Sequence, residues 1–106
     1  MRLLAALLLL VLPAGAAPFS HALFEQVLQA QVDGEGRVDY SQLKKSPALL
    51  DAYVDSLGKC SPRSHPGRFP TPRHELAYWI NAYNAFVLRG VIDGYPVSRV
   101  DELGGL

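Results

Sequence analysis

Residues 76–90 decide the fold, and they read Leu-Ala-Tyr-Trp-Ile-Asn-Ala-Tyr-Asn-Ala-Phe-Val-Leu-Arg-Gly. Thr71-Pro72 precedes this stretch with an N-cap residue and a proline at the first helical position, and Gly94 and Pro96 follow it. The pattern predicts one long helix from about residue 72 to residue 92. Apolar residues cover nearly every face of this helix, which is typical of a helix that is buried.

Two more helices are predicted upstream. Ser20 is the expected N-cap of the first, which the turn residues 33–36 (Asp-Gly-Glu-Gly) end. Ser46-Pro47 begins the second, which stops at Gly58. Apolar residues recur at helical spacing in both: Leu23, Phe24, Val27 and Leu28, then Leu49, Leu50, Tyr53, Val54 and Leu57.

The predicted class of the segment is therefore mainly α, with about three helices and a short extended piece near residues 37–40. Ser41 is the expected cap of a turn after that piece. Two neighbouring helices are too few to surround the long helix, so we expect an incomplete core. An apolar patch on residues 76–88 should stay exposed and favour self-association or a protein partner.

The first sixteen residues predict a secretory signal peptide. Arg2 provides the positive charge, residues 3–12 form an apolar run, and Ala14-Gly15-Ala16 is a small-residue cleavage pattern. The run is too short for a stable membrane span. We therefore expect cleavage after Ala16, a mature chain of residues 17–106, and a periplasmic or secreted location.

Composition excludes other classes of function. Lys and Arg number 10, and Asp and Glu also number 10, so the chain lacks the basic surface of a nucleic-acid-binding protein. The single cysteine excludes an internal disulfide framework, and we expect no metal site and no cofactor. Cys60 lies in a proline-rich stretch, residues 59–72, which predicts a surface loop or linker. His65 is the nearest candidate base for this thiol, but a flexible loop would not hold the two together.

Residues 31–42 resemble an EF-hand calcium loop in spacing. Aligning Gly36 with the glycine that the loop requires places Gln31 at position 1 and Gln42 at position 12. Calcium binding depends on an Asp at the first position and a bidentate Glu at the twelfth. Both are neutral amides here, so a polar turn between helices is the favoured interpretation.

Asn81 and Asn84 are the candidate site residues of the long helix. They lie three residues apart and so share one side of it. A buried amide without a partner costs about 1–3 kcal/mol, so two amides in an apolar helix should have partners elsewhere in the fold. His74 and Tyr78 fall on the same arc, which suggests a polar stripe. Two interpretations stay open: a site wall that orients a ligand, and an anchor to a neighbouring loop.

Two stretches resemble the domain-of-unknown-function 547 family. The first is Gly36-Arg37-Val38-Asp39-Tyr40, and the second is Leu76-Ala77-Tyr78-Trp79-Ile80-Asn81-Ala82-Tyr83-Asn84-Ala85, with its specific string Trp79–Asn84. The likeness covers about residues 23–103 and implies the N-terminal part of an α+β domain, often found in exported bacterial proteins. In that family the domain continues through a second half with its own His and Cys positions.

Three functions follow as hypotheses. The first is an exported binding or structural module with no activity of its own. The second, implied by the resemblance, is the N-terminal fragment of a cysteine- and histidine-dependent hydrolase or transferase, with Asn81 or Asn84 orienting the base. The third is a degenerate calcium loop at residues 31–42.

Overall fold

The computed structural model describes residues 17–96, and these form four α-helices and one short 3-10 helix. The α-helices are α2 (Ala22–Gln31), α3 (Tyr40–Lys45), α4 (Ala48–Lys59) and α5 (Pro72–Gly94), and η1 (Pro66–Arg68) precedes α5. The segment is mainly α, as predicted. The predicted leader, its cleavage site and the predicted irregular end after Val97 lie outside the described residues.

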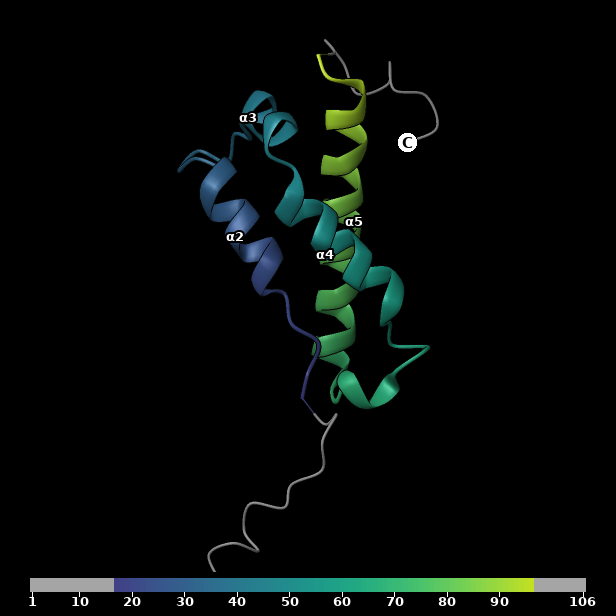
Figure 1. The fold of residues 1–106 in the computed structure, drawn as a ribbon. Helices are drawn as coiled ribbons and strands as arrows, with labels where there is room; N and C mark the ends of the chain where they lie inside the picture. The colour runs from purple at the N-terminus through teal and green to yellow at the C-terminus, as the bar shows by residue number, and fades with distance from the viewer. Residues whose placement is uncertain (1–16, 97–106) are drawn as a thin grey trace, which may run out of the picture.

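Helix α5 is the longest element; α3 and α4 pack against it, and α2 packs on α4 (Figure 1). It has 23 residues and is therefore about 34 Å long. Thr71 caps it: the Thr71 hydroxyl accepts a hydrogen bond from the His74 backbone N–H, and Pro72 occupies the first turn. This start agrees with the sequence prediction, and the helix extends two residues beyond the predicted end.

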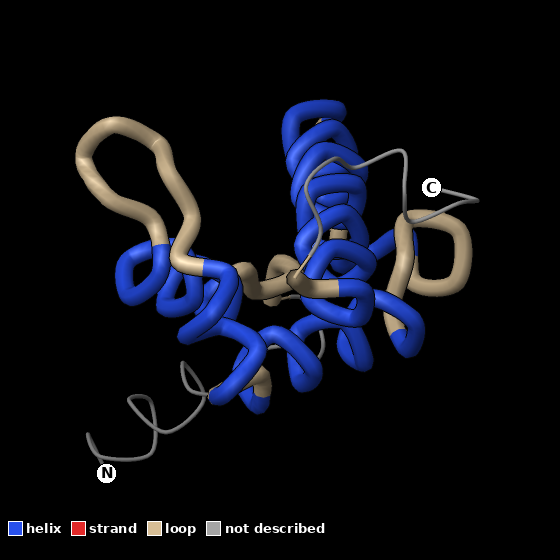
Figure 2. Tube along the Cα trace, turned by 90° about the horizontal axis from the view of Figure 1, so that it is seen from above, coloured by secondary structure: helices blue, strands red, loops and turns tan. Residues whose placement is uncertain are grey.

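Helix α3 is a correction to the sequence analysis, which expected a turn capped by Ser41. The cap is Asp39, whose carboxylate accepts a 3.0 Å hydrogen bond from the Gln42 backbone N–H. Before it, Val38 pairs with Val32 in an isolated antiparallel bridge, which is the predicted extended piece. The loop between these two residues extends away from the helices (Figure 2).

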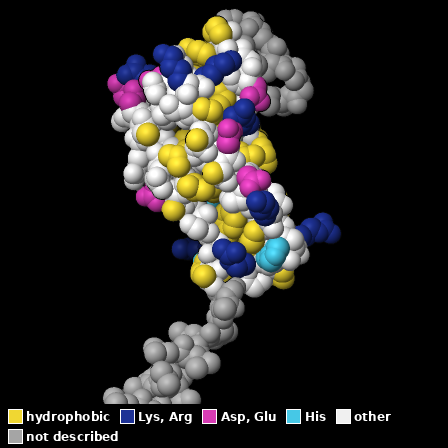
Figure 3. Space-filling view, in the orientation of Figure 1, with side chains coloured by type: hydrophobic (Ala, Val, Ile, Leu, Met, Phe, Trp, Pro, Cys, Tyr) yellow, Lys and Arg dark blue, Asp and Glu magenta, His cyan; other side chains and the backbone are white. Residues whose placement is uncertain are grey.

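The core lies around α4, which packs on both α2 and α5. Phe24 stacks on Tyr53 at 4.9 Å between ring centroids, and Leu43, Leu50, Tyr53 and Ala85 are at most 1% exposed. The face of the molecule that Figure 3 shows mixes hydrophobic and charged side chains. At the edge of the core, Arg89 of α5 donates a hydrogen bond to Asp51 of α4 and so links the two helices. Arg89 also forms an ion pair with Asp93, one turn further along α5.

Of the two interpretations of the proline-rich stretch, a surface loop or a linker, the contacts fit a loop that packs against the segment before α2. Phe69 is 5% exposed and stacks on Phe19 at 5.6 Å, while the Arg68 side chain donates a 2.6 Å hydrogen bond to the Ala17 carbonyl. The Phe19 backbone N–H in turn donates to the Arg68 carbonyl. These bonds fasten the segment before α2 onto the loop before α5.

Candidate functional site

A pocket of about 290 Å³ opens between α2, the start of α3 and one side of α5. Its walls bring together the two stretches that carry the family resemblance: Val38 and Tyr40 from one, Asn81 and Asn84 from the other. Every residue that lines it is uncharged; the remaining four are Phe24, Leu28, Val87 and Leu88. A neutral pocket with two amides favours an uncharged group as occupant, because a charged one would lose hydration there.

The two asparagines are less buried than the sequence predicted. Asn81 is half-buried and Asn84 is exposed, and within residues 17–96 neither side chain makes a hydrogen bond. The expected anchor to a neighbouring loop is therefore not formed by the described residues. The physical reason is their position on the helix, since both lie on the flank between the buried side of α5 and its open side.

His74, Tyr78 and Asn81, which were expected to form one polar stripe, do not share one environment in the structure. Tyr78 is 4% exposed, and its hydroxyl donates a 2.6 Å hydrogen bond to the Leu57 carbonyl in α4. His74 is half-buried, and its Nδ1 lies 2.6 Å from the Thr71 hydroxyl at the start of α5. Tyr78 and His74 therefore act within the fold, and neither lines the pocket that Asn81 and Asn84 share.

The open side of α5 carries a run of exposed apolar side chains, here called the α5 stripe: Leu76, Trp79, Ile80, Tyr83 and Phe86. Their exposed fractions are between 50% and 71%. Residues 76–88 contain no charged side chain, so nothing on this part of the helix repels an apolar surface. The predicted exposed patch is present, whereas the expectation of burial on all faces is wrong.

His21 and Tyr53 form a pair that the sequence analysis missed. His21 Nδ1 lies 2.6 Å from the Tyr53 hydroxyl, across 32 residues of chain. Burial lowers the pKa of His21, and the neighbouring His74 lowers it further. Burial also raises the pKa of Tyr53 to about 12, with a smaller contribution from Tyr78. Nothing in the local sequence signals this pair, because α2 and α4 bring it together only in the folded chain.

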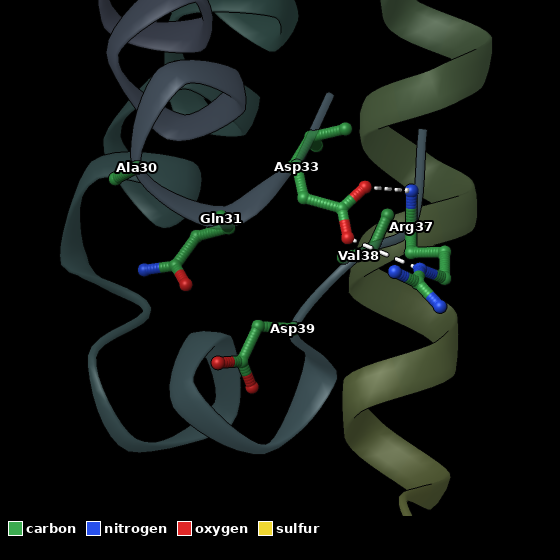
Figure 4. A pocket seen from close by; sticks show the side chains of 7 residues that line it. Ala30, Gln31, Asp33, Arg37, Val38 and Asp39 are labelled. Atoms are coloured by element: carbon green, nitrogen blue, oxygen red, sulfur yellow. Dashed lines mark hydrogen bonds and ion pairs between the residues drawn. The ribbon is translucent and has the colours of Figure 1, made fainter. Parts of the chain in front are cut away.

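The loop that resembles an EF-hand uses its own carboxylates internally. Asp33 accepts hydrogen bonds from the backbone N–H groups of Arg37 and Glu35, and these bonds lower the pKa of its carboxyl. The bond from Arg37 lowers it the most. Figure 4 shows the Asp33 carboxylate turned toward Arg37, whose guanidinium it also pairs with at 3.1 Å. Asp39 caps α3 as described above.

A second pocket lies beside this loop, and Gln31, Asp33, Arg37 and Asp39 are among the residues that line it. The Gln31 Oε1 is buried without a hydrogen-bond partner among residues 17–96. Within that part of the chain, no group of three or more His, Cys, Asp or Glu side chains is arranged to hold a metal ion. The geometry therefore gives the calcium hypothesis no ligand set.

Cys60 is 8% exposed, and the Arg68 guanidinium donates a 3.8 Å hydrogen bond to its sulfur. His65, the candidate base, instead places its Nδ1 2.8 Å from the Ser64 hydroxyl. The two residues therefore do not form a nucleophile and base pair in this structure.

Comparison with known protein families, with curated proteins and with solved structures finds no match. No helix in the described part of the chain is long and apolar enough to cross a membrane. The arguments that follow therefore depend on the sequence and on the geometry of the α5 stripe and the pocket beside it.

Proposed function

We propose that the chain is an exported binding module that docks on another protein through the α5 stripe and has no activity of its own. The observation that carries this proposal is the position of the stripe. Five large apolar side chains, three of them aromatic, lie side by side on the open side of one rigid helix. Contiguous exposed apolar surface of this kind is typical of interaction sites, and aromatic side chains supply most of the binding energy in such sites.

Export supports the proposal from the sequence. The leader pattern at residues 1–16 favours a periplasmic or secreted protein, and a balanced charge does not favour nucleic acid as a partner. The partner surface should be apolar, because charged groups placed against the stripe would lose hydration without gaining a counter-charge.

Site-specific cross-linking tests the proposal. A photo-reactive amino acid at Tyr83, which is 71% exposed in the stripe, should form defined cross-linked products in the producing cells. The same amino acid at Ala52, an exposed position in α4 outside the stripe, is the matched control. Products from neither position, or equal products from both, would contradict a docking function of the stripe.

A second candidate is the N-terminal part of a cysteine- and histidine-dependent hydrolase or transferase of the family it resembles. It is supported by the pocket, where Val38 and Tyr40 meet Asn81 and Asn84 and the two amides have no hydrogen bond within residues 17–96. In this proposal the amides orient a base that another segment provides. Genomic DNA beyond the Leu106 codon tests it: a continuing frame with His and Cys supports it, and a stop codon followed by unrelated sequence contradicts it.

A further inference from the structure

We infer that the occupant of the α5 stripe is a second copy of this chain, packed antiparallel along the stripe about a two-fold axis. This inference rests on the proposed function and names its partner. Its evidence is the spacing of the stripe, its lack of charge, the residues at its two ends and the area that it exposes.

The spacing suits a helix that packs on a copy of itself. Leu76, Ile80, Tyr83 and Val87 follow one another at intervals of four, three and four residues. This is the 3.5-residue repeat with which two long helices stay in contact over several turns. Trp79, Tyr83 and Phe86 form a second row at the same intervals. A surface with this repeat presents matching ridges and grooves to an identical surface, as a two-fold interface requires.

The charges at the ends of the stripe favour the antiparallel arrangement. The middle of residues 76–87 falls between Ile80 and Tyr83, so a two-fold axis there sets Ile80 against Tyr83 of the partner subunit. In the same register Glu75, just before the stripe, lies level with Leu88 of the partner subunit and far from the partner's Glu75. A parallel pair would instead place the two Glu75 carboxylates at the same level and align the two helix dipoles unfavourably.

The exposed area is sufficient for a specific pair. At 53%, 71% and 50% exposed, Trp79, Tyr83 and Phe86 together leave about 350 Å² open, taking roughly 200 Å² for each aromatic side chain. Leu76 at 59% and Ile80 at 51% raise this to about 500 Å² for one copy. Two copies would then bury at most about 1,000 Å² in all, which is the lower limit for a specific interface and fits a weak, reversible pair.

Sedimentation equilibrium of the purified chain, between about 1 and 300 μM, tests the pairing. We expect a reversible monomer–dimer equilibrium in this range for the natural sequence and for Ala52→Glu. Tyr83→Glu should weaken association by at least about 100-fold, because each dimer would bury two unpaired carboxylates. Circular dichroism should show that Tyr83→Glu stays folded, since that side chain is 71% exposed and contributes little to the core. A monomer at every concentration would overturn the inference.

The distance between spin labels at Arg73→Cys tests the orientation. Arg73 is exposed before the stripe, and Cys60 is buried, so the unmodified chain serves as the labelling control. Seventeen residues along the helix axis separate the two labels in the antiparallel register, which corresponds to about 26 Å. Labels within about 15 Å of each other would indicate a parallel pair and overturn this part of the inference.

Cross-linking from Tyr83 distinguishes failure of this inference from failure of the proposed function. Products containing two copies of the chain support both. A monomer in sedimentation whose Tyr83 cross-links to a different protein overturns the inference and leaves the docking function standing. A monomer that gives no stripe-specific product overturns both.

Discussion

The hydroxyl of Tyr78 donates a 2.6 Å hydrogen bond to the backbone carbonyl of Leu57, and this bond joins the last turn of α4 to the first turns of α5. The Leu57 carbonyl is one of the last four of α4, which have no partner inside their own helix. Tyr78 therefore completes the hydrogen bonding of one helix while its ring packs against Phe69 and Phe19. Tyr78, which the sequence analysis placed in a polar site wall, therefore stabilises the fold.

Tyr78→Phe should remove this hydrogen bond and leave a buried carbonyl unsatisfied. We expect the free energy of unfolding to fall by about 1–3 kcal/mol, because the ring packing stays and only the bond is lost. Chemical denaturation followed by circular dichroism measures the change. Tyr83→Phe is the matched control and should have almost no effect, because Tyr83 is 71% exposed. Equal effects from the two variants would contradict the role given to Tyr78.

Asp39 and Ser41 provide a test of which residue begins α3. Asp39→Ala should lower the free energy of unfolding by about 0.5–2 kcal/mol, because the Gln42 backbone N–H loses its cap. Ser41→Ala should change it by much less, since Ser41 is exposed inside the helix and does not cap it. Thermal unfolding of both variants gives the comparison. A larger loss from Ser41→Ala would show that the sequence prediction, and not the structure, has the correct cap.

Local signals predicted the positions of the helices but not all of their caps, since the N-caps of α2 and α4 are His21 and Pro47 and not the expected Ser20 and Ser46. The Thr71-Pro72 start of α5 and the turn after α2 depend on neighbouring residues, and both are found where the sequence placed them. The order within residues 59–72 was not predictable from composition. Prolines indicate a loop, but the burial of Phe69 depends on Phe19, which is fifty residues away in the chain. The same holds for the Arg68 bond to the Ala17 carbonyl.

The His21–Tyr53 pair should make stability depend on pH. Burial lowers the folded-state pKa of His21 below its ordinary value of 6.5, so the unfolded chain binds more protons between these two values. The free energy of unfolding should therefore fall as pH falls below about 6.5, and the full contribution of neutral His21 should be present above that pH. Denaturation at intervals from pH 5 to pH 7.5 measures this slope.

His21→Gln removes the titrating group and should flatten that part of the pH profile. His65→Gln is the control, because His65 is exposed in the loop before η1 and should leave the slope unchanged. A profile that keeps its slope in His21→Gln would assign the pH dependence to another group.

The candidate site was predictable only in part. The three-residue spacing of Asn81 and Asn84 correctly places both side chains at one pocket. Their exposure was not predictable, because it depends on which side of α5 the other helices cover. The five apolar residues of the stripe give the helix the composition of a buried one, while α3 and α4 pack on its other side and α2 packs on α4.

Asn81 therefore offers the clearest contrast between sequence and structure. If its amide were a buried anchor, Asn81→Ala would cost about 1–3 kcal/mol, as expected for a lost buried hydrogen bond. Because the described chain gives this amide no hydrogen bond and it is only half-buried, we expect a change below about 0.5 kcal/mol. Asn84→Ala should behave alike, since Asn84 is exposed. Denaturation of both variants beside Tyr78→Phe, which probes a real buried bond in the same helix, gives the comparison. A loss from Asn81→Ala as large as that from Tyr78→Phe would mean that the amide holds the fold together and is not free to face a ligand or a partner.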